Sequence, residues 1–305
     1  MNAAGEAPRG FSDPRILGAF LLITLIWGST WIVIKDQLGT VPPTWSVTYR
    51  YVFAIAAMFG YASWARQRLS LPVSGHLLAA AIGFPQFFLN FNFVYAAEFH
   101  ITSGLVATVF ALLMVPNTVL AWFFFRQRVG LGFAAGSALA IAGVVLLFVQ
   151  ELRSSAAEPS EVLLGIALTM GGVLAASASN VMQISRAVRS HPVPVLLSWA
   201  MLYGTLFNAG FALATQGPPV VEARAGYWLG LIYLGVFASA LAFTLYFRII
   251  REVGPGRAAY SSVLVPIIAM AISTVAEGYR WSPLAICGGL LALAGLVLAL
   301  RSRSA

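Results

Sequence analysis

Residues 140–146 read Ala-Ile-Ala-Gly-Val-Val-Leu, and residues 292–298 repeat the pattern as Ala-Leu-Ala-Gly-Leu-Val-Leu. Met114-Val115-Pro116 matches Leu264-Val265-Pro266 at nearly the same separation, and Gly104 matches Gly254. Chance matching of apolar strings is the alternative, but several separate pairs near one offset of about 151 residues favour an internal duplication. We therefore expect a first unit over residues 1–150 and a second unit over residues 151–305.

The composition places both units in a membrane. Of the 305 residues, 60% are hydrophobic and only 9% are charged, whereas soluble domains carry roughly 25% charged residues. The mean hydropathy is +0.86. These values exclude a soluble enzyme, a nucleic-acid-binding protein and a disordered chain, and they predict a multi-pass membrane protein. The single Cys287 allows no intrachain disulfide.

Apolar segments of membrane-spanning length recur along the whole chain. A transmembrane helix needs about 20 mostly apolar residues, and Pro-rich or Gly-rich breaks separate the candidates. The pattern predicts an all-α fold with ten transmembrane helices and no soluble domain. The predicted spans cover residues 15–35, 44–65, 76–97, 101–125, 130–150, 162–186, 193–214, 226–248, 255–277 and 281–301.

Basic residues alternate from loop to loop. Cytoplasmic loops are rich in Lys and Arg, so the bias predicts that both termini are cytoplasmic in a bacterial-type inner membrane. Each unit has an odd number of spans, so the two units enter the membrane from opposite sides, as in many secondary transporters. The net charge of +8 is then explained by orientation and contact with anionic lipid, not by nucleic acid. The cytoplasmic set comprises Arg9, Arg15, Arg66, Arg68, Arg126, Arg128, Arg186, Arg189, Arg248, Arg251, Arg257, Arg301 and Arg303, against Lys35, Arg153, Arg224 and Arg280 outside.

The ten spans, the Trp27-Gly28 pair, the matched Pro116 and Pro266, and the duplicated Ala/Gly-rich fifth and tenth spans resemble the drug/metabolite transporter superfamily. Each half resembles an EamA-type repeat, and the chain as a whole is most similar to the YddG-type amino-acid exporters. The resemblance implies a secondary transporter and the direction of export. Such repeats often carry a Glu after their fourth helix; Glu277 fits this pattern, but Gln127 stands at the matching position of the first half.

Polar and aromatic side chains inside the spans are the candidate substrate ligands, because polar groups in a bilayer tend to face a protein interior or a cavity. Interhelical hydrogen bonding is the alternative for Gln86 and Asn90, and a membrane-interface belt is the alternative for the aromatic residues. The predicted substrate-binding set is Trp27, Thr30, Trp31, Arg50, Gln86, Asn90, Asn180, Gln183, Tyr246, Tyr260 and Ser261.

Arg50 is the one charge clearly inside a span, about 10 Å of helical rise from Pro43. Flanked by Tyr49 and Tyr51, its guanidinium could bind a substrate carboxylate or stack on a ring. Alternatively, the long side chain snorkels to the membrane surface.

Helix-breaking residues indicate candidate hinges, and small residues indicate helices that pack closely. Pro85, Pro116, Gly254, Pro255 and Pro266 are candidate hinges, with permanently packed kinks as the alternative. The small residues of the fifth and tenth spans favour close helix packing. These two spans are therefore a scaffold or the contact of a homodimer, so the chain is expected to be a monomer or a homodimer.

The remaining features separate a transporter from other membrane proteins. Ion coupling usually needs a carboxylate or His within the membrane, whereas Glu98, His100 and Glu277 lie near span ends. Neither HExxH nor GxSxG is present, which argues against an intramembrane enzyme, a catalytic residue, a metal or a cofactor. The sequence predicts export of small metabolites, foremost amino acids including aromatic ones, by alternating access around a neutral aromatic cavity without strict ion coupling. The alternatives are a multidrug or other neutral-metabolite carrier of the same superfamily and, from a different class, an intramembrane enzyme.

Overall fold

The computed structural model describes residues 13–126, 130–154, 158–183, 185–253 and 261–301, and the regular secondary structure of this part of the chain is helical. Where the structure describes them, the predicted spans are mostly helical. The first half holds α1 (Pro14–Asp36), α2 (Pro43–Trp64), α3 (Val73–Gly83), the π-helix η1 (Phe84–Leu89), α4 (Asn90–Ala97), α5 (Ser103–Phe110), the 3₁₀ turn η2 (Ala111–Leu113), α6 (Met114–Phe125) and α7 (Leu131–Ser154).

Among its described residues the second half has a similar order, with one short additional helix and an undivided fourth segment. It holds α8 (Pro159–Met182), the added α9 (Arg186–Arg189), α10 (Val193–Gln216), α11 (Ala225–Ile232), the π-helix η3 (Tyr233–Leu241), α12 (Ala242–Val253), α14 (Ser261–Ala276) and α15 (Pro283–Arg301).

Proline marks the start of several helices. Pro14, Pro43 and Pro159 stand at the first positions of α1, α2 and α8, where the missing N–H has no intrahelical partner to lose. Asp13 also caps α1 by accepting a hydrogen bond from the Arg15 N–H at 2.9 Å. The breaks read from the sequence therefore start the helices that follow them.

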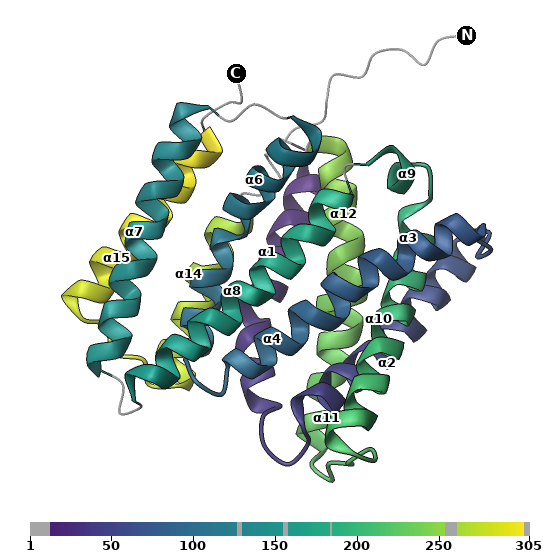
Figure 1. Cartoon of the computed structure of the whole chain (residues 1–305), viewed down its shortest axis with the longest axis horizontal. Coiled ribbons are helices and arrows are strands. Elements are labelled where there is room, and N and C mark those ends of the chain that lie inside the picture. The colour runs from purple at the N-terminus through teal and green to yellow at the C-terminus, as the bar shows by residue number, and fades with distance from the viewer. Residues whose placement is uncertain (1–12, 127–129, 155–157, 184, 254–260, 302–305) are drawn as a thin grey trace.

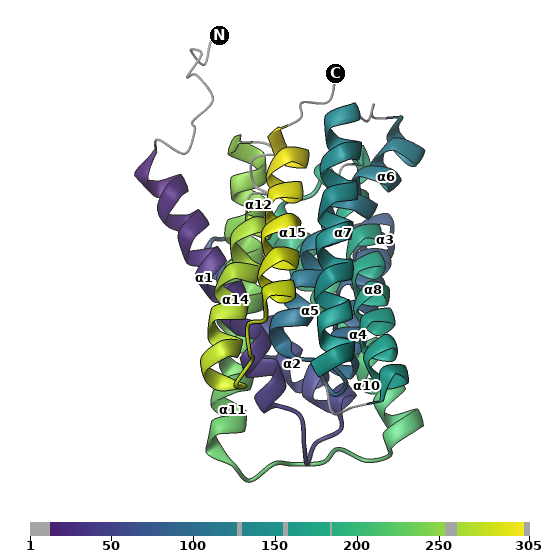
Figure 2. The ribbon, with the colours of Figure 1, turned by 90° about the vertical axis from the view of Figure 1, so that its left-hand side faces the viewer.

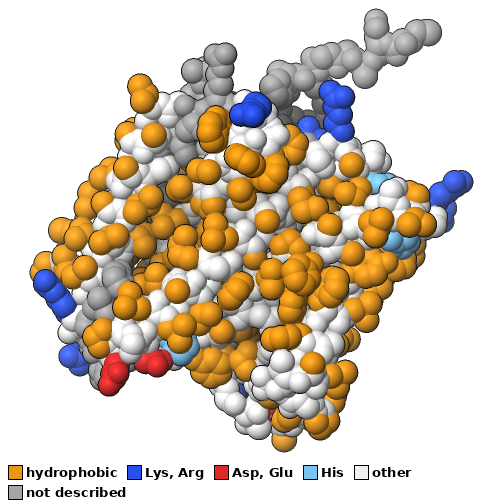
Figure 3. Space-filling view, in the orientation of Figure 1, with side chains coloured by type: hydrophobic (Ala, Val, Ile, Leu, Met, Phe, Trp, Pro, Cys, Tyr) orange, Lys and Arg blue, Asp and Glu red, His pale blue; other side chains and the backbone are white. Residues whose placement is uncertain are grey.

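The helices run between two ends of the molecule. We call the end where α1 begins and α15 ends the near end, and the end where α1 ends the far end (Figure 2). Hydrophobic side chains cover the face between these ends, and charged side chains gather at its margins (Figure 3). Among the described residues, six helical stretches are long and apolar enough to cross a membrane: Pro14–Asp36, Val73–Ala97, Ser103–Phe125, Pro159–Met182, Val193–Gln216 and Ala225–Tyr246.

Helices of the two halves pack against each other in pairs. α1 packs on α14 and α12, α2 on α10 and η3, and α4 on α8. The interior is therefore shared by both halves, and any site inside it draws side chains from both.

The duplicated Ala/Gly motifs bring α7 and α15 together at one edge of the molecule (Figure 1). A Cβ atom added at Gly143 would lie 2.2 Å from the Ala292 nitrogen, and one at Gly295 would lie 2.2 Å from the Ala140 nitrogen. Only glycine permits this approach of backbone to backbone. The small residues thus pack within one chain, which supports the scaffold interpretation of these spans.

We expect Gly295→Ala and Gly143→Ala to lower the free energy of unfolding by about 1–3 kcal/mol each, because backbone atoms oppose the new methyl group. Thermal unfolding in detergent measures the effect. Gly289→Ala is the matched control on α15: nothing lies within 4 Å of the added Cβ, so its stability should stay unchanged or rise. Equal destabilisation by all three variants would contradict the packing described here.

Candidate functional site

Two π-helices interrupt the third and eighth spans at matched positions of the two halves. η1 begins at Phe84 and η3 at Tyr233, and such segments are frequent at functional sites. Side chains bind the carbonyl groups of both segments. Asn208 Nδ2 donates to the Phe87 carbonyl at 2.9 Å, Ser239 Oγ donates to the Leu234 carbonyl at 2.9 Å, and Trp27 Nε1 donates to the Ala238 carbonyl at 3.1 Å.

Arg50 lies in the interior beside η3. Its side chain is buried, with the residue 2% exposed, so the snorkelling alternative is wrong. Nε and Nη2 both donate to Ser239 Oγ at 3.2 Å, and the guanidinium carbon lies 4.2 Å from the ring centroid of Phe91. No Asp or Glu among the described residues forms an ion pair with it, and Nη1 has no hydrogen-bond partner.

Two buried hydroxyl groups accompany this guanidinium. The Tyr51 and Tyr95 side chains lie within electrostatic reach of Arg50, and neither hydroxyl makes a hydrogen bond of good geometry. Burying a charge without a counter-charge is costly, and so is burying a polar group without a partner. The cluster of Arg50, Tyr51 and Tyr95 thus offers N–H and O–H donors that suit an anionic group such as a carboxylate.

Aromatic rings connect Arg50 to Trp27 across the two halves. Tyr51 lies 5.3 Å from Phe91 and 5.2 Å from Phe87, measured between ring centroids. Phe87 lies 5.8 Å from Phe243, which lies 5.6 Å from Trp27. Trp27 in turn lies 5.0 Å from Tyr246. The structure therefore joins three predicted residues, Arg50, Trp27 and Tyr246, through Tyr51 and through three phenylalanine rings that sequence reasoning did not single out.

Other predicted ligands of the first half make local contacts. Thr30 Oγ1 donates to the Trp27 carbonyl at 2.8 Å, and the Trp31 ring packs 5.4 Å from Phe110 while its Nε1 has no partner. Gln86 and Asn90 are both buried. Asn90 Nδ2 donates to the Gln86 carbonyl at 3.4 Å and its Oδ1 has no partner.

The remaining predicted residues lie toward the near end. Asn180 and Gln183 are half-buried at the end of α8, and Ser261 is buried at the start of α14. Of the predicted hinges, Pro85 lies in η1, Pro116 follows η2, and Pro266 lies inside the continuous α14. Tyr260, Gly254 and Pro255 fall outside the described residues.

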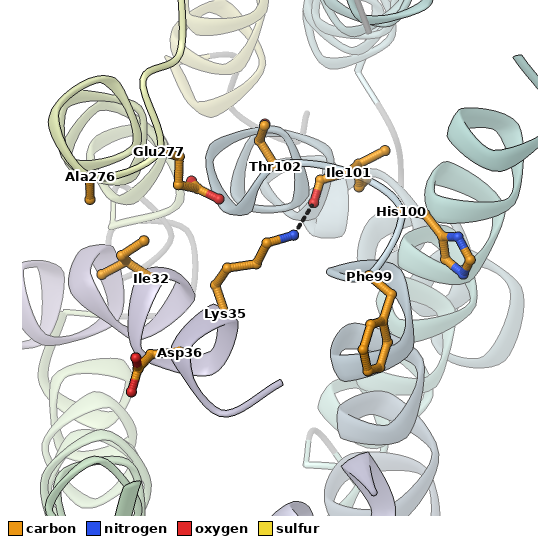
Figure 4. Close-up of a pocket in the computed structure, with 9 residues that line it drawn as sticks. All are labelled: Ile32, Lys35, Asp36, Phe99, His100, Ile101, Thr102, Ala276 and Glu277. Carbon is orange, nitrogen blue, oxygen red and sulfur yellow. Dashed lines mark hydrogen bonds between the residues drawn. The ribbon is translucent and has the colours of Figure 1, made fainter. Parts of the chain in front are cut away.

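A second cluster of polar side chains lies at the far end. Lys35, at the end of α1, donates from Nζ to the main-chain carbonyls of Glu98 and, at 3.3 Å, of Ile101. Glu277, just past α14, accepts hydrogen bonds from the Ser103 hydroxyl and from Ser273 Oγ at 2.6 Å. A cavity of about 560 Å³ opens beside these groups, and Lys35 reaches across it (Figure 4).

The sequence places Glu98 near the end of a span, but the structure buries its side chain. The residue is 0% exposed, and neither carboxyl oxygen has a hydrogen-bond partner. Burial raises the pKa of the Glu98 carboxyl well above its usual value; the Lys35 charge opposes this shift and the Glu277 charge adds to it. A hydropathy window places Glu98 at a span end, but only the packing of the 98–102 loop against other helices shows its burial.

Two ion pairs at the far end are at least partly exposed to solvent. Arg224 Nη1 donates to both carboxyl oxygens of Asp36 at 2.9 Å, and these hydrogen bonds raise the pKa of the guanidinium. His100 Nδ1 lies 2.5 Å from Glu161 Oε2. Each of these acids thus has its own basic partner.

Comparison with known sequences places the chain in a protein family that agrees with this fold. The sequence profile of the EamA-like transporter family matches the chain twice, over residues 15–149 and 163–301. The chain belongs to this family, within the drug/metabolite transporter superfamily, and is a non-enzymatic multi-pass membrane carrier.

Individual relatives have informative names. The chain is 27% identical to a probable amino-acid metabolite efflux pump of Escherichia coli, over 93% of this chain and 95% of the relative. It is 26% identical to a protein of the same name from Salmonella typhimurium, over 91% and 92%. A probable terminal-alkyne amino-acid exporter of Streptantibioticus cattleyicolor is 25% identical, over 93% of each chain. One crystal structure shares the fold with a TM-score of 0.68 at 19% identity, covering 93% of this chain and 96% of the other.

We expect Asn208→Ala to lower the free energy of unfolding by about 1–3 kcal/mol, because the Phe87 carbonyl of η1 then loses a buried donor. Asn208 also accepts a hydrogen bond from Asn92 Nδ2 at 2.5 Å. Thermal unfolding measures the change. Thr215→Ala, which removes an exposed hydroxyl bonded within the same helix, should have almost no effect; an equally small effect at Asn208 would contradict a role in holding η1.

Proposed function

We propose that the protein exports small metabolites that carry a carboxylate, foremost amino acids including aromatic ones, across the inner membrane. The observation that carries the proposal is Arg50, a buried guanidinium without an ion-pair partner among the described residues. A charge kept in this position without a counter-charge costs stability, and intramembrane charges commonly mark substrate pathways. The substrate carboxylate is the counter-charge.

The surroundings of Arg50 support this substrate class. Nη1 and the hydroxyls of Tyr51 and Tyr95 offer unused donors to a carboxylate. The rings of Phe91, Tyr51 and Phe87 continue from the guanidinium toward the second half, and they supply apolar faces for a substrate side chain. The names of the efflux-pump and exporter relatives agree with this chemistry.

In the proposed transport cycle, the site opens to one side of the membrane at a time. The site draws Arg50 from α2 and Ser239 from η3, so it lies between the two halves, where carriers with inverted repeats bind substrate. We place the near end at the cytoplasm because of the Arg-rich loops. Trp27, Thr30, Trp31, Gln86, Asn90, Asn180, Gln183, Tyr246, Tyr260 and Ser261 remain proposed ligands, and Pro85, Pro116, Gly254, Pro255 and Pro266 remain proposed hinges.

Substrate binding at Arg50 requires no ion coupling. A guanidinium stays charged throughout the physiological pH range, so a carboxylate binds and leaves without a proton being exchanged at this site. The gradient of the substrate is then sufficient to drive net flux. A cationic drug, by contrast, is repelled by Arg50.

Transport in proteoliposomes tests the proposal. We expect saturable efflux of radiolabelled amino acids from a panel of Phe, Trp, Thr, Met, Lys and Glu. Unlabelled phenylalanine should compete with the labelled substrate, whereas phenylalanine amide, which lacks the carboxylate, should not. Equal competition by the two compounds would contradict the assigned role of Arg50, and absence of flux for the whole panel would contradict amino-acid transport.

We expect Arg50→Met to raise the KM at least about tenfold, because it removes a buried partner of the substrate charge. Without substrate the same variant should unfold at an equal or higher temperature, since an apolar group replaces an uncompensated charge. Arg50→Lys keeps the charge and should retain part of the affinity. Arg248→Met, at an exposed near-end arginine, is the control; strong destabilisation by Arg50→Met with unchanged KM would identify Arg50 as structural.

A further inference from the structure

The far-end cluster has an excess of acid. Of the four carboxyl groups described above there, Asp36 is paired with Arg224 and Glu161 with His100. The charges of Lys35 and Glu277 both act on Glu98, in opposite directions. Two carboxylates beside one ammonium carry a net negative charge, which one bound proton neutralises.

The hydrogen bonds decide which carboxyl group holds that proton. Glu277 accepts from the Ser103 main-chain N–H, the Ser103 hydroxyl and Ser273 Oγ, and such donors stabilise the ionised form. Glu98 has no donor at either oxygen and no contact with solvent. Lys35 donates to main-chain carbonyls and not to the Glu98 carboxyl. Burial of an ionised carboxyl without hydrogen bonds is strongly unfavourable.

The same groups connect helices at the far end. Lys35 connects α1 to the 98–101 loop, and Glu277 connects the end of α14 to the start of α5. α1 and α14 pack together, as do α4 and α8, so opening of the far end separates these two pairs. Figure 4 shows Lys35 and Glu277 at the cavity between them. Opening admits water to the 98–102 loop.

We propose that Glu98 is a proton-binding site that controls opening of the far end: its carboxyl group holds a proton while this end is closed and releases it to water when the end opens. The proton moves between the Glu98 carboxyl and solvent, and Lys35 remains an ammonium. Because the closed form binds one proton more than the open form, acid favours the closed form and alkali favours the open form. The burial-raised pKa of Glu98 agrees with this direction.

The other ionisable groups near Glu98 do not account for the proposed proton binding. Tyr95, one turn earlier on α4, is a phenol that remains neutral over the pH range of interest. His100 is partly exposed and paired with Glu161. Asp36 and Arg224 are exposed and paired with each other. Lys35 and Glu277 therefore remain as the charges that act on Glu98.

Substrate exchange at equal pH on both sides of a proteoliposome isolates this control from any driving force. We expect exchange of labelled phenylalanine to slow by about tenfold per pH unit below an inflection, the slope of a single linked proton. Glu98→Gln cannot ionise, so its exchange should be slow and independent of pH. Lys35→Met removes the charge that lowers the Glu98 pKa, so its inflection should move to higher pH.

Two control variants test the assignment to Glu98. Glu161→Gln and His100→Gln remove the exposed pair and should leave the inflection in place. A pH-independent wild type, or a Glu98→Gln variant that keeps the wild-type pH dependence, would overturn the proposal. Loss of the dependence in His100→Gln would move the site to that histidine and overturn it as well.

A distance measurement separates this proposal from the identity of the substrate. Spin labels at Leu163 on α8 and Val275 on α14, which are 53% and 88% exposed, report on the separation of the two helix pairs in a Cys287→Ser background. In lipid nanodiscs without substrate, we expect a longer distance to gain population as the pH rises, and Glu98→Gln to show the short distance at every pH. This result supports the proposal even if no amino acid is exchanged, and identical pH responses of the two proteins refute it.

Discussion

Every peptide group inside a bilayer needs a hydrogen-bond partner from the protein, and the rest of this structure depends on that constraint. Regular α-helices satisfy it without help. η1 and η3 do not follow the regular pattern, and side chains from other elements bind their carbonyl groups. Asn208 of α10 serves η1, while Trp27 of α1 serves η3. The irregular backbone is therefore tied to helices of the opposite half, and Ser239 of η3 is held where Arg50 reaches it.

Polar chemistry is concentrated in two places that serve different purposes. The Arg50 cluster in the interior has more donors than acceptors, and the Glu98 cluster at the far end has more acid than base. Both imbalances cost stability, and neither is needed to hold the helices together, since the close backbone contact of α7 and α15 shows what a purely structural pairing looks like. The proposed ligands, a carboxylate at Arg50 and a proton at Glu98, would correct the two imbalances.

The sequence predicts the helices well because their signal is local. Long apolar runs, prolines at helix starts and the repeated Ala-x-Ala-Gly motif locate the spans and the duplication. Arg50 stands out for the same reason, as a charge in an apolar run. Three features have no local signal. η3 lacks even the proline that marks η1, Ser239 and Phe243 reach the site only through packing between halves, and Glu98 looks exposed until the 98–102 loop is seen against α1 and α14.

The unpaired guanidinium of Arg50 also affects the protein before it transports anything. A ligand that binds only the folded state shifts the folding equilibrium toward that state. In a cell, marginally stable chains are continuously removed by proteases. Under the proposed function, a metabolite that neutralises Arg50 would protect newly made copies from degradation. Cellular abundance of the carrier would then follow the concentration of its own cargo, a form of feedback that needs no transcriptional regulator.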